Sequence, residues 1–180
     1  EGRYGEGGAY RDPNSPYRSW YDFDSRYKGG YRSWWGFETL PEVNEETPSY
    51  VEFITGEGGV IDTWLRRGAA GFRLDVADEL PDEFIEKVRT AVKRVGPDKF
   101  LLGEVWEDAT TKFGFDKRRT YLLGKGLDSV MNYPFKNAVL GFVCGRDAGQ
   151  TMTDILSICE HYPAPALDTA LNFLSTHDTE

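Results

Sequence analysis

The sequence predicts an α/β fold in which short strands alternate with amphipathic helices. Apolar residues recur at helical spacing between four short, mostly apolar segments that have the length of strands. Strands this short and apolar are typical of parallel strands buried on both faces. The pattern alone is compatible with both a closed barrel and a doubly wound sheet. The expected strands are 69–75, 100–105, 127–132 and 170–175.

The predicted helices follow from caps and from apolar spacing. Thr47 and Pro48 suit the N-cap and the first position of a helix, which glycines at 56, 58 and 59 are expected to interrupt. Between 81 and 95, five apolar residues share one helical face and should pack on the sheet. These are Phe84, Ile85, Val88, Ala91 and Val92, and further helices are expected around 135–142 and 151–161.

The segment 1–46 is rich in Gly, Tyr, Trp, Arg and Asp and shows little periodicity. This composition predicts an irregular loop subdomain, followed by an α/β body at 47–180. Flat aromatic faces with polar edges suit sugar rings. Packing within the subdomain is the alternative and is expected for most of these rings. They are Tyr17, Trp20, Tyr21, Tyr27, Tyr31, Trp34 and Trp35.

The formal net charge of −9 argues against nucleic acid and membrane partners and leaves neutral ligands open. No segment has the roughly 18 apolar residues that a membrane span needs. Cys144 and Cys159 lie among apolar residues without metal-ligand spacing, so we expect buried free thiols and a reducing, cytoplasmic location. Acidic residues of the loops are potential calcium ligands but lack a recognisable spacing, so we predict no metal cofactor. They are Asp12, Asp22, Asp24 and Glu38.

Acidic residues follow or end several predicted strands. Asp75 ends one strand, Glu104 lies late in the next, and His177 with Asp178 follows the last. In parallel α/β folds the active site forms at this edge. Asp75 and Glu104 lie about one βα unit apart, which predicts neighbouring strands roughly 4.7–4.9 Å apart. Two inward carboxyl groups would then lie near the roughly 5–5.5 Å separation of retaining glycosidases.

Arg73 should distinguish the two carboxyl groups. It lies two residues before Asp75, on the same side of the strand, and should hold Asp75 ionised as a nucleophile. Glu104 is then left to act as general acid and afterwards as base. Acids at strand ends that merely face solvent or cap helices are the alternative for any single residue.

Three motifs resemble those of the alpha-amylase family of glycoside hydrolases. The segment 71–79, GFRLDVADE, resembles the strand that carries the family's nucleophile, and 103–106, GEVW, is similar to its acid/base motif. The segment 173–178, FLSTHD, looks like its last motif. The resemblance implies a partial (β/α)8 TIM barrel at 47–180, about strands 4 to 7, with 1–46 as a loop subdomain inserted after the third barrel strand. It implies Asp75 as nucleophile, Glu104 as acid/base and Asp178 as transition-state stabiliser, with Arg73 and His177 assisting through hydrogen bonds.

A fourth motif narrows the resemblance to one branch. The segment 40–44, LPEVN, resembles the loop-subdomain motif of neopullulanases, cyclomaltodextrinases and related α-glycosidases, and 34–37 and 131–135 look like the same branch. The family's motif at the third strand is absent. The resemblance makes four further residues candidates for substrate binding, with Asp78 standing where the branch often has Asn. They are Trp106, Asn44, Asp78 and Glu79.

The function implied is retaining hydrolysis of α-glucosidic bonds in maltooligosaccharides, cyclodextrins or pullulan-type glucans by double displacement. One alternative is a metal-dependent barrel enzyme in which Asp75, Glu104 and Asp178 ligate Mg²⁺, but Arg73 disfavours such a site. Another is a non-catalytic carbohydrate-binding relative, which need not keep all three acids. We expect half a barrel to be inactive alone and to pair with a second copy through its open edges.

Overall fold

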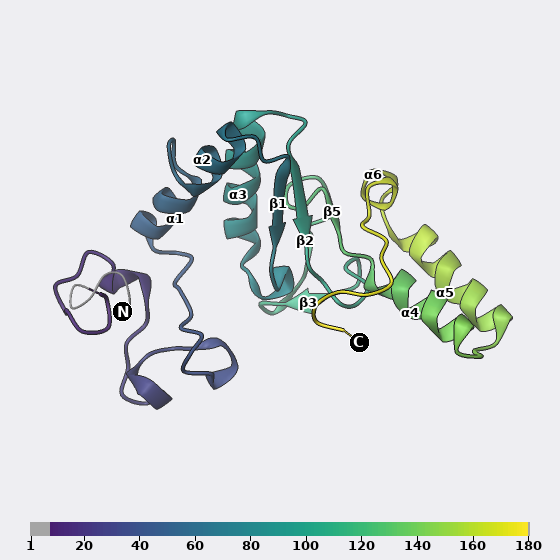
Figure 1. The fold of residues 1–180 in the computed structure, drawn as a ribbon, viewed down its shortest axis with the longest axis horizontal. Helices are drawn as coiled ribbons and strands as arrows, with labels where there is room; N and C mark the ends of the chain where they lie inside the picture. The colour runs from purple at the N-terminus through teal and green to yellow at the C-terminus, as the bar shows by residue number, and fades with distance from the viewer. Residues whose placement is uncertain (1–7, 180) are drawn as a thin grey trace. The chain divides into compact units, whose positions relative to one another are not determined.

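The structure is a computed structural model that describes residues 8–179 (Figure 1). The chain forms two compact units, Glu1–Ile54 and Thr55–Glu180. The second unit contains a parallel sheet flanked by helices, which confirms the α/β class. The interpretation of 1–46 as an inserted subdomain stays a prediction.

Unit 1 is held together by isolated bridges rather than by full strands. Its 3-10 helices are η2 (Arg18–Trp20), η3 (Lys28–Gly30) and η4 (Trp34–Gly36). Between them, antiparallel bridges join Tyr21 to Val43, Phe23 to Tyr31 and Ser33 to Pro41. The irregular character expected of this region is therefore present.

Two helices replace the single interrupted helix that Pro48 was expected to begin. They are α1 (Pro48–Thr55) and α2 (Val60–Arg66), and Gly58 between them has a φ of 74°, which favours glycine. The interruption and the first residue are confirmed. Thr47 is the residue before the helix, and its carbonyl accepts from the Val51 N–H at 3.0 Å, as expected at the N-cap position. Its side chain donates to the Ser19 carbonyl at 2.9 Å.

The central sheet is parallel and has the order β1, β2, β5 (Figure 1). Its strands are β1 (Gly71–Leu74), β2 (Phe100–Gly103) and β5 (Ser129–Val130). Helix α3 (Asp82–Val95) connects the first two and buries all five residues predicted for its inner face. The crossover helix follows from that spacing, since an apolar stripe needs a sheet to cover it.

The fourth predicted strand, 170–175, is wrong in extent. Only Leu171 pairs, through a parallel bridge to Met131 and a 2.9 Å bond from the Asn132 N–H to its carbonyl. The ladder stops because helix α4 (Tyr133–Val143) begins directly after Asn132, so β5 has no further extended residues to offer.

The remaining elements are short or were only partly predicted. Helix α5 (Ala148–His161) follows α4 and packs against it. A hairpin of β3 (Phe113–Gly114) and β4 (Lys117–Arg118) was not predicted. Its two turn residues both have positive φ, as a tight hairpin requires. The others are η5 (Ala77–Glu79) and α6 (Ala164–Asp168).

The two cysteines are free and exposed, so the expectation that they are buried is wrong. Cys144 is the residue that follows the last turn of α4. Cys159 lies on an outward face of α5 with the exposed Met152 and Leu156 at helical spacing, so apolar neighbours in sequence did not mean burial. Among the helices of residues 8–179, none combines the length and apolar character needed to span a bilayer.

Candidate active site

The parallel register places Asp75 and Glu104 side by side. Leu74 pairs with Gly103 as the last residues of β1 and β2, and each acid is the next residue along its strand. The prediction that the two acids follow neighbouring strands is therefore confirmed. A Cβ on Gly103 would lie 2.3 Å from Leu127, so glycine here lets the sheet approach the next layer closely.

The two carboxyl groups differ in exposure. The Glu104 side chain is 5% exposed, whereas that of Asp75 is 72% exposed. The backbone N–H of Val76 donates to Glu104 Oε2 at 2.8 Å, and the indole N–H of Trp106 donates to Oε1 at 2.9 Å. Glu104 is thus fixed in orientation, while Asp75 faces solvent and is accessible to a ligand.

Val76 presents its N–H to Glu104 from an unusual backbone conformation. Its φ of 44° and ψ of 47° lie in the left-handed region, which is disfavoured for a β-branched side chain. The next residue, Ala77, donates to the Glu104 carbonyl at 3.0 Å. The turn after the nucleophile candidate is therefore bound to the acid/base candidate at two points.

Arg73 contacts both acids. Its guanidinium hydrogen-bonds Asp75 through Nη1, and Nη2 lies 3.0 Å from Glu104 Oε1. The expected contact between Arg73 and Asp75 is therefore present, and the register also brings Glu104 within reach of the same guanidinium. That Arg73 assigns different roles to the two acids stays a prediction.

An aromatic stack supports Trp106. Its ring lies on Tyr133, with centroids 4.7 Å apart and an interplanar angle of 15°, and Phe173 packs edge-on against Tyr133 at 4.8 Å. Burial raises the pKa of Tyr133, and the negative charges of Glu104 and Asp178 act in the same direction. Tyr133 is therefore a site residue that the sequence did not single out, although it lies within the branch motif at 131–135.

His177 and Asp178 occupy a tight turn after the Leu171 bridge. The Asp178 N–H donates to the Thr176 hydroxyl at 3.2 Å, and His177 Nε2 lies 3.3 Å from the Asp178 carboxylate. Their polar contacts within residues 8–179 stay inside this turn. The negative charge of Asp178 nevertheless contributes to the raised pKa of Tyr133.

Asp78 and Glu79 lie in the turn after Asp75, in the 3-10 helix η5. The Asp78 carboxylate lies 2.9 Å from Lys112 Nζ, and Glu79 is exposed. The buried Arg119 hydrogen-bonds the carbonyls of Asp78 and Leu80 and lies 2.8 Å from Asp82. The structure thus gives Asp78 an ion-pairing contact, and sequence reasoning missed Arg119, which fastens this turn.

Asn44 belongs to unit 1 and organises its own loop. Its N–H donates to the Trp20 carbonyl at 2.7 Å, its side-chain oxygen accepts from the Glu46 N–H at 3.0 Å, and its side-chain nitrogen lies 3.4 Å from Asp22. These contacts are internal to the loop subdomain. A substrate-binding role for Asn44 stays a prediction.

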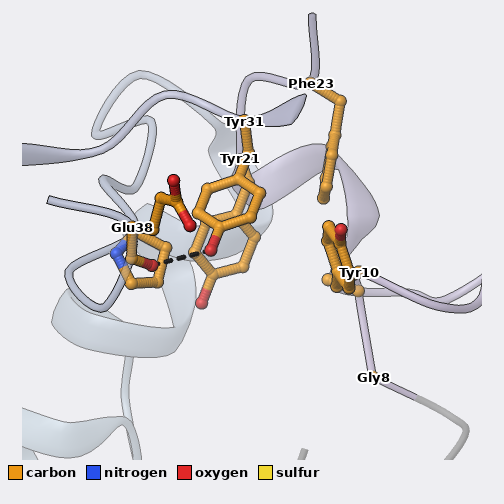
Figure 2. Close-up of a pocket in the computed structure, with 8 residues that line it drawn as sticks. Gly8, Tyr10, Tyr21, Phe23, Tyr31 and Glu38 are labelled. Carbon is orange, nitrogen blue, oxygen red and sulfur yellow. Dashed lines mark hydrogen bonds between the residues drawn. The ribbon is translucent and has the colours of Figure 1, made fainter. Parts of the chain in front are cut away.

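The aromatic residues of unit 1 mostly pack on one another, as the structural alternative predicted. Trp20 contacts Tyr17, Tyr50 and Phe53, and Trp34 stacks on Trp35. Beside them lies a cavity of about 450 Å³ (Figure 2). The cavity is lined by Gly8, Ala9, Tyr10, Tyr21, Phe23, Tyr31, Glu38 and Pro41.

Among residues 8–179, no three His, Cys, Asp or Glu side chains are grouped as metal ligands.

Comparison with known proteins gives consistent results. The chain is 32% identical over 209 aligned residues to an amylopullulanase of Thermoanaerobacterium saccharolyticum, covering 99% of this chain and 16% of that protein. It is 36% identical to a cyclomaltodextrinase of a Bacillus species, covering 79% of this chain and 24% of that protein. The chain therefore spans less than a quarter of the length of these curated relatives.

Solved structures give the same relationship. The cyclic alpha-maltosyl-(1→6)-maltose hydrolase of Arthrobacter globiformis superposes with a TM-score of 0.82 at 27% identity, covering 96% of this chain and 38% of that one. The family model for the alpha amylase catalytic domain matches residues 13–180. That family has a TIM-barrel fold, and the parallel sheet here is part of such an α/β body. The chain belongs to the alpha-amylase catalytic-domain family.

Proposed function

We propose that the protein containing this chain is a retaining glycoside hydrolase that cleaves α-glucosidic bonds of maltooligosaccharides, cyclodextrins or pullulan-type glucans. The observation that carries the proposal is the group formed by Arg73, Asp75 and Glu104 at the carboxyl ends of two adjacent parallel strands. Family membership supports it, as do relatives named for the hydrolysis of such glucans.

In the proposed reaction, Asp75 attacks the anomeric carbon while the bond to the leaving sugar oxygen breaks. Glu104 donates its proton to that oxygen. Glu104 then removes a proton from water, which displaces Asp75 and releases a sugar of retained configuration. The exposure of Asp75 fits a nucleophile that must reach substrate, and the fixed orientation of Glu104 fits a proton donor.

The other roles are proposed from position. Asp178, beside His177, would stabilise the oxocarbenium-like transition state, and Arg73 would orient Asp75. In the whole protein, β1, β2, β5 and the segment around Leu171 would be about strands 4 to 7 of a (β/α)8 barrel. Residues 1–46 would be a subdomain inserted after the third strand.

Further proposals concern the activity and self-association of the isolated chain, and the metal dependence and location of the whole protein. We expect the 180-residue chain alone to be inactive and to pair with a second copy through open barrel edges. We expect turnover by the whole protein to be unchanged by EDTA, since its acidic residues lack calcium-ligand spacing. A cytoplasmic location is likewise proposed.

The proposal is tested with the whole protein and p-nitrophenyl α-maltoside, pullulan and cyclodextrin, following the anomeric configuration of the product by NMR. We expect the α-anomer first. Asp75→Asn should abolish turnover, whereas Asp116→Asn in the exposed β3–β4 turn should not. The β-anomer, or full activity of a folded Asp75→Asn variant, would contradict the roles given to Asp75 and Glu104.

A further inference from the structure

Three extended segments of unit 1, joined by isolated antiparallel bridges, present two unlike faces. The segments are 21–23, 31–33 and 41–43. The Arg32 N–H donates to the Asp22 carbonyl at 2.9 Å, and the Glu42 N–H donates to the Arg32 carbonyl at 3.1 Å. On one face the Arg32 guanidinium lies 2.6 Å from Glu42 and 3.7 Å from Asp22. This face is charged and its ions are paired.

The opposite face is aromatic, because side chains alternate along extended chain. Tyr21 and Phe23 have ring centroids 6.4 Å apart, and Phe23 and Tyr31 have centroids 6.3 Å apart, both pairs edge to face. The Tyr31 hydroxyl donates to the Glu38 carbonyl at 2.7 Å, which fixes that ring. Figure 2 shows the Tyr21 and Tyr31 rings beside Glu38 and the Phe23 ring next to Tyr10.

Tyr10 closes the other side of the cavity. Its ring meets Tyr31 edge-on, with centroids 5.4 Å apart, and remains 58% exposed. The Arg18 guanidinium donates to the Ala9 carbonyl at 2.7 Å and lies 3.2 Å from the centroid of Phe23. The wall that carries Tyr10 is thus tied to Phe23 by Arg18, so the cavity has a defined shape.

The rings around this cavity leave space between them, whereas Trp20 has three aromatic neighbours around its ring. The cavity beside Tyr21 opens to solvent and measures about 450 Å³. That volume is within the roughly 300–1,000 Å³ range of small-ligand sites.

We propose that this aromatic cavity, defined by Tyr10, Tyr21, Phe23, Tyr31 and Glu38, binds a neutral oligosaccharide of the α-glucan class. Ring faces suit the CH patches of sugars, and phenol hydroxyls with the Glu38 carboxylate suit their hydroxyl groups. The acidic chain disfavours anionic ligands. The choice of α-glucan rests on the proposed function. None of the lining residues belongs to the group around Asp75.

The experiment uses the 180-residue chain in native gels containing glycogen and in calorimetric titration with maltotriose. Tyr10→Ala should weaken binding at least tenfold, because it removes the most exposed wall of the cavity. Tyr10→Phe keeps the ring and should retain most of the binding. The matched control is Tyr27→Ala, which removes another exposed tyrosine of unit 1 that does not line the cavity, and it should bind like wild type. Circular dichroism establishes that each variant is folded.

The outcomes separate this proposal from the proposed function. Absence of retardation by glycogen, or equal binding by folded Tyr10→Ala and wild type, overturns carbohydrate binding by this cavity and leaves turnover by the whole protein to be judged separately. Loss of binding in Asp75→Asn but not in Tyr10→Ala also overturns it. If the whole protein is inactive but the 180-residue chain still binds glycogen in a way that depends on Tyr10, the proposed function is contradicted and the cavity proposal stands.

Discussion

The indole N–H of Trp106 donates a 2.9 Å hydrogen bond to Glu104, while the same ring stacks on the buried Tyr133. One side chain therefore links the acid/base candidate to the start of α4. Because Phe173 packs on the edge of Tyr133, the segment before Asp178 joins the same assembly. The orientation of Glu104 thus depends on residues from three separate parts of the chain.

Replacing Trp106 with Phe should reduce kcat of the whole protein about tenfold. The variant keeps an aromatic ring on Tyr133 but loses one hydrogen bond, whose roughly 1.4 kcal/mol corresponds to that factor. Initial rates on p-nitrophenyl α-maltoside measure kcat and KM separately. The control Trp64→Phe changes an exposed tryptophan on α2 and should leave kcat unaltered. An unchanged kcat in Trp106→Phe would contradict the claim that the indole N–H orients Glu104.

Replacing Arg73 with Lys should cost roughly a hundredfold in kcat. A lysine ammonium is a point charge and cannot reach Asp75 and Glu104 with the two arms that the guanidinium provides. Arg67→Lys, at an exposed position beyond α2, is the matched control. Steady-state kinetics of the whole protein measure kcat for both variants. Comparable kcat values would contradict the claim that the Arg73 guanidinium serves both Asp75 and Glu104 in the reaction.

Arg119→Met should lower the free energy of unfolding by about 3–5 kcal/mol, because it removes the buried cation 2.8 Å from Asp82 and leaves that acid only Lys117, at 3.7 Å. The double variant Arg119→Met with Asp82→Leu should regain part of this loss, since it removes the stranded charge as well. The carbonyls of Asp78 and Leu80 still lack their donor. Urea midpoints of the 180-residue chain measure the effect, and additive losses in the double variant would show that the pair is not coupled.

The lowered pKa of Asp128 leads us to expect a loss of stability in acid. Burial acts to raise the pKa of Asp128, but hydrogen bonds from Lys93, Arg89 and the Leu101 N–H outweigh it and lower the pKa. A lowered folded-state pKa contributes stability that is present above the unfolded value of about 3.9 and is lost as pH falls through the folded value. Unfolding free energy should therefore decline below about pH 4.

Asp128→Asn should remove that part of the pH dependence and cost about 1–3 kcal/mol at pH 7, since Lys93 and Arg89 lose a buried acceptor. Asp168→Asn, at an exposed position, is the control and should change neither quantity. Urea titrations from pH 3 to 7 measure both. A slope in acid that is identical in Asp128→Asn and wild type would contradict the assignment.

The parts that could be predicted are those with local signals. The apolar face of α3 follows from spacing alone, and Asp75 and Glu104 follow from their positions after short apolar strands. The pairing of the 170–175 segment could not be predicted, because its length is limited by where α4 begins rather than by its own residues. The β3–β4 hairpin lacks a glycine in its turn, so the usual signal was missing.

The shared role of Arg73 and the buried position of Arg119 depend on tertiary contacts. Arg73 reaches Glu104 only because β1 and β2 are in register, and Arg119 reaches Asp82 across 37 residues of sequence. An arginine in a basic run such as Lys117–Arg118–Arg119 gives no sign of burial. The cavity beside Tyr21 likewise results from bridges between segments about ten residues apart, which have no periodic pattern.

The exposed thiols of Cys144 and Cys159 affect how self-association is interpreted. Two accessible sulfhydryl groups allow chains to become covalently linked through disulfides in air-exposed solution, without any complementary surface between them. A dimer band on a non-reducing gel would therefore not be evidence for pairing through barrel edges. Sedimentation under reductant is the informative measurement. The same two thiols also offer natural attachment points for a maleimide dye near α4 and α5, away from the acids.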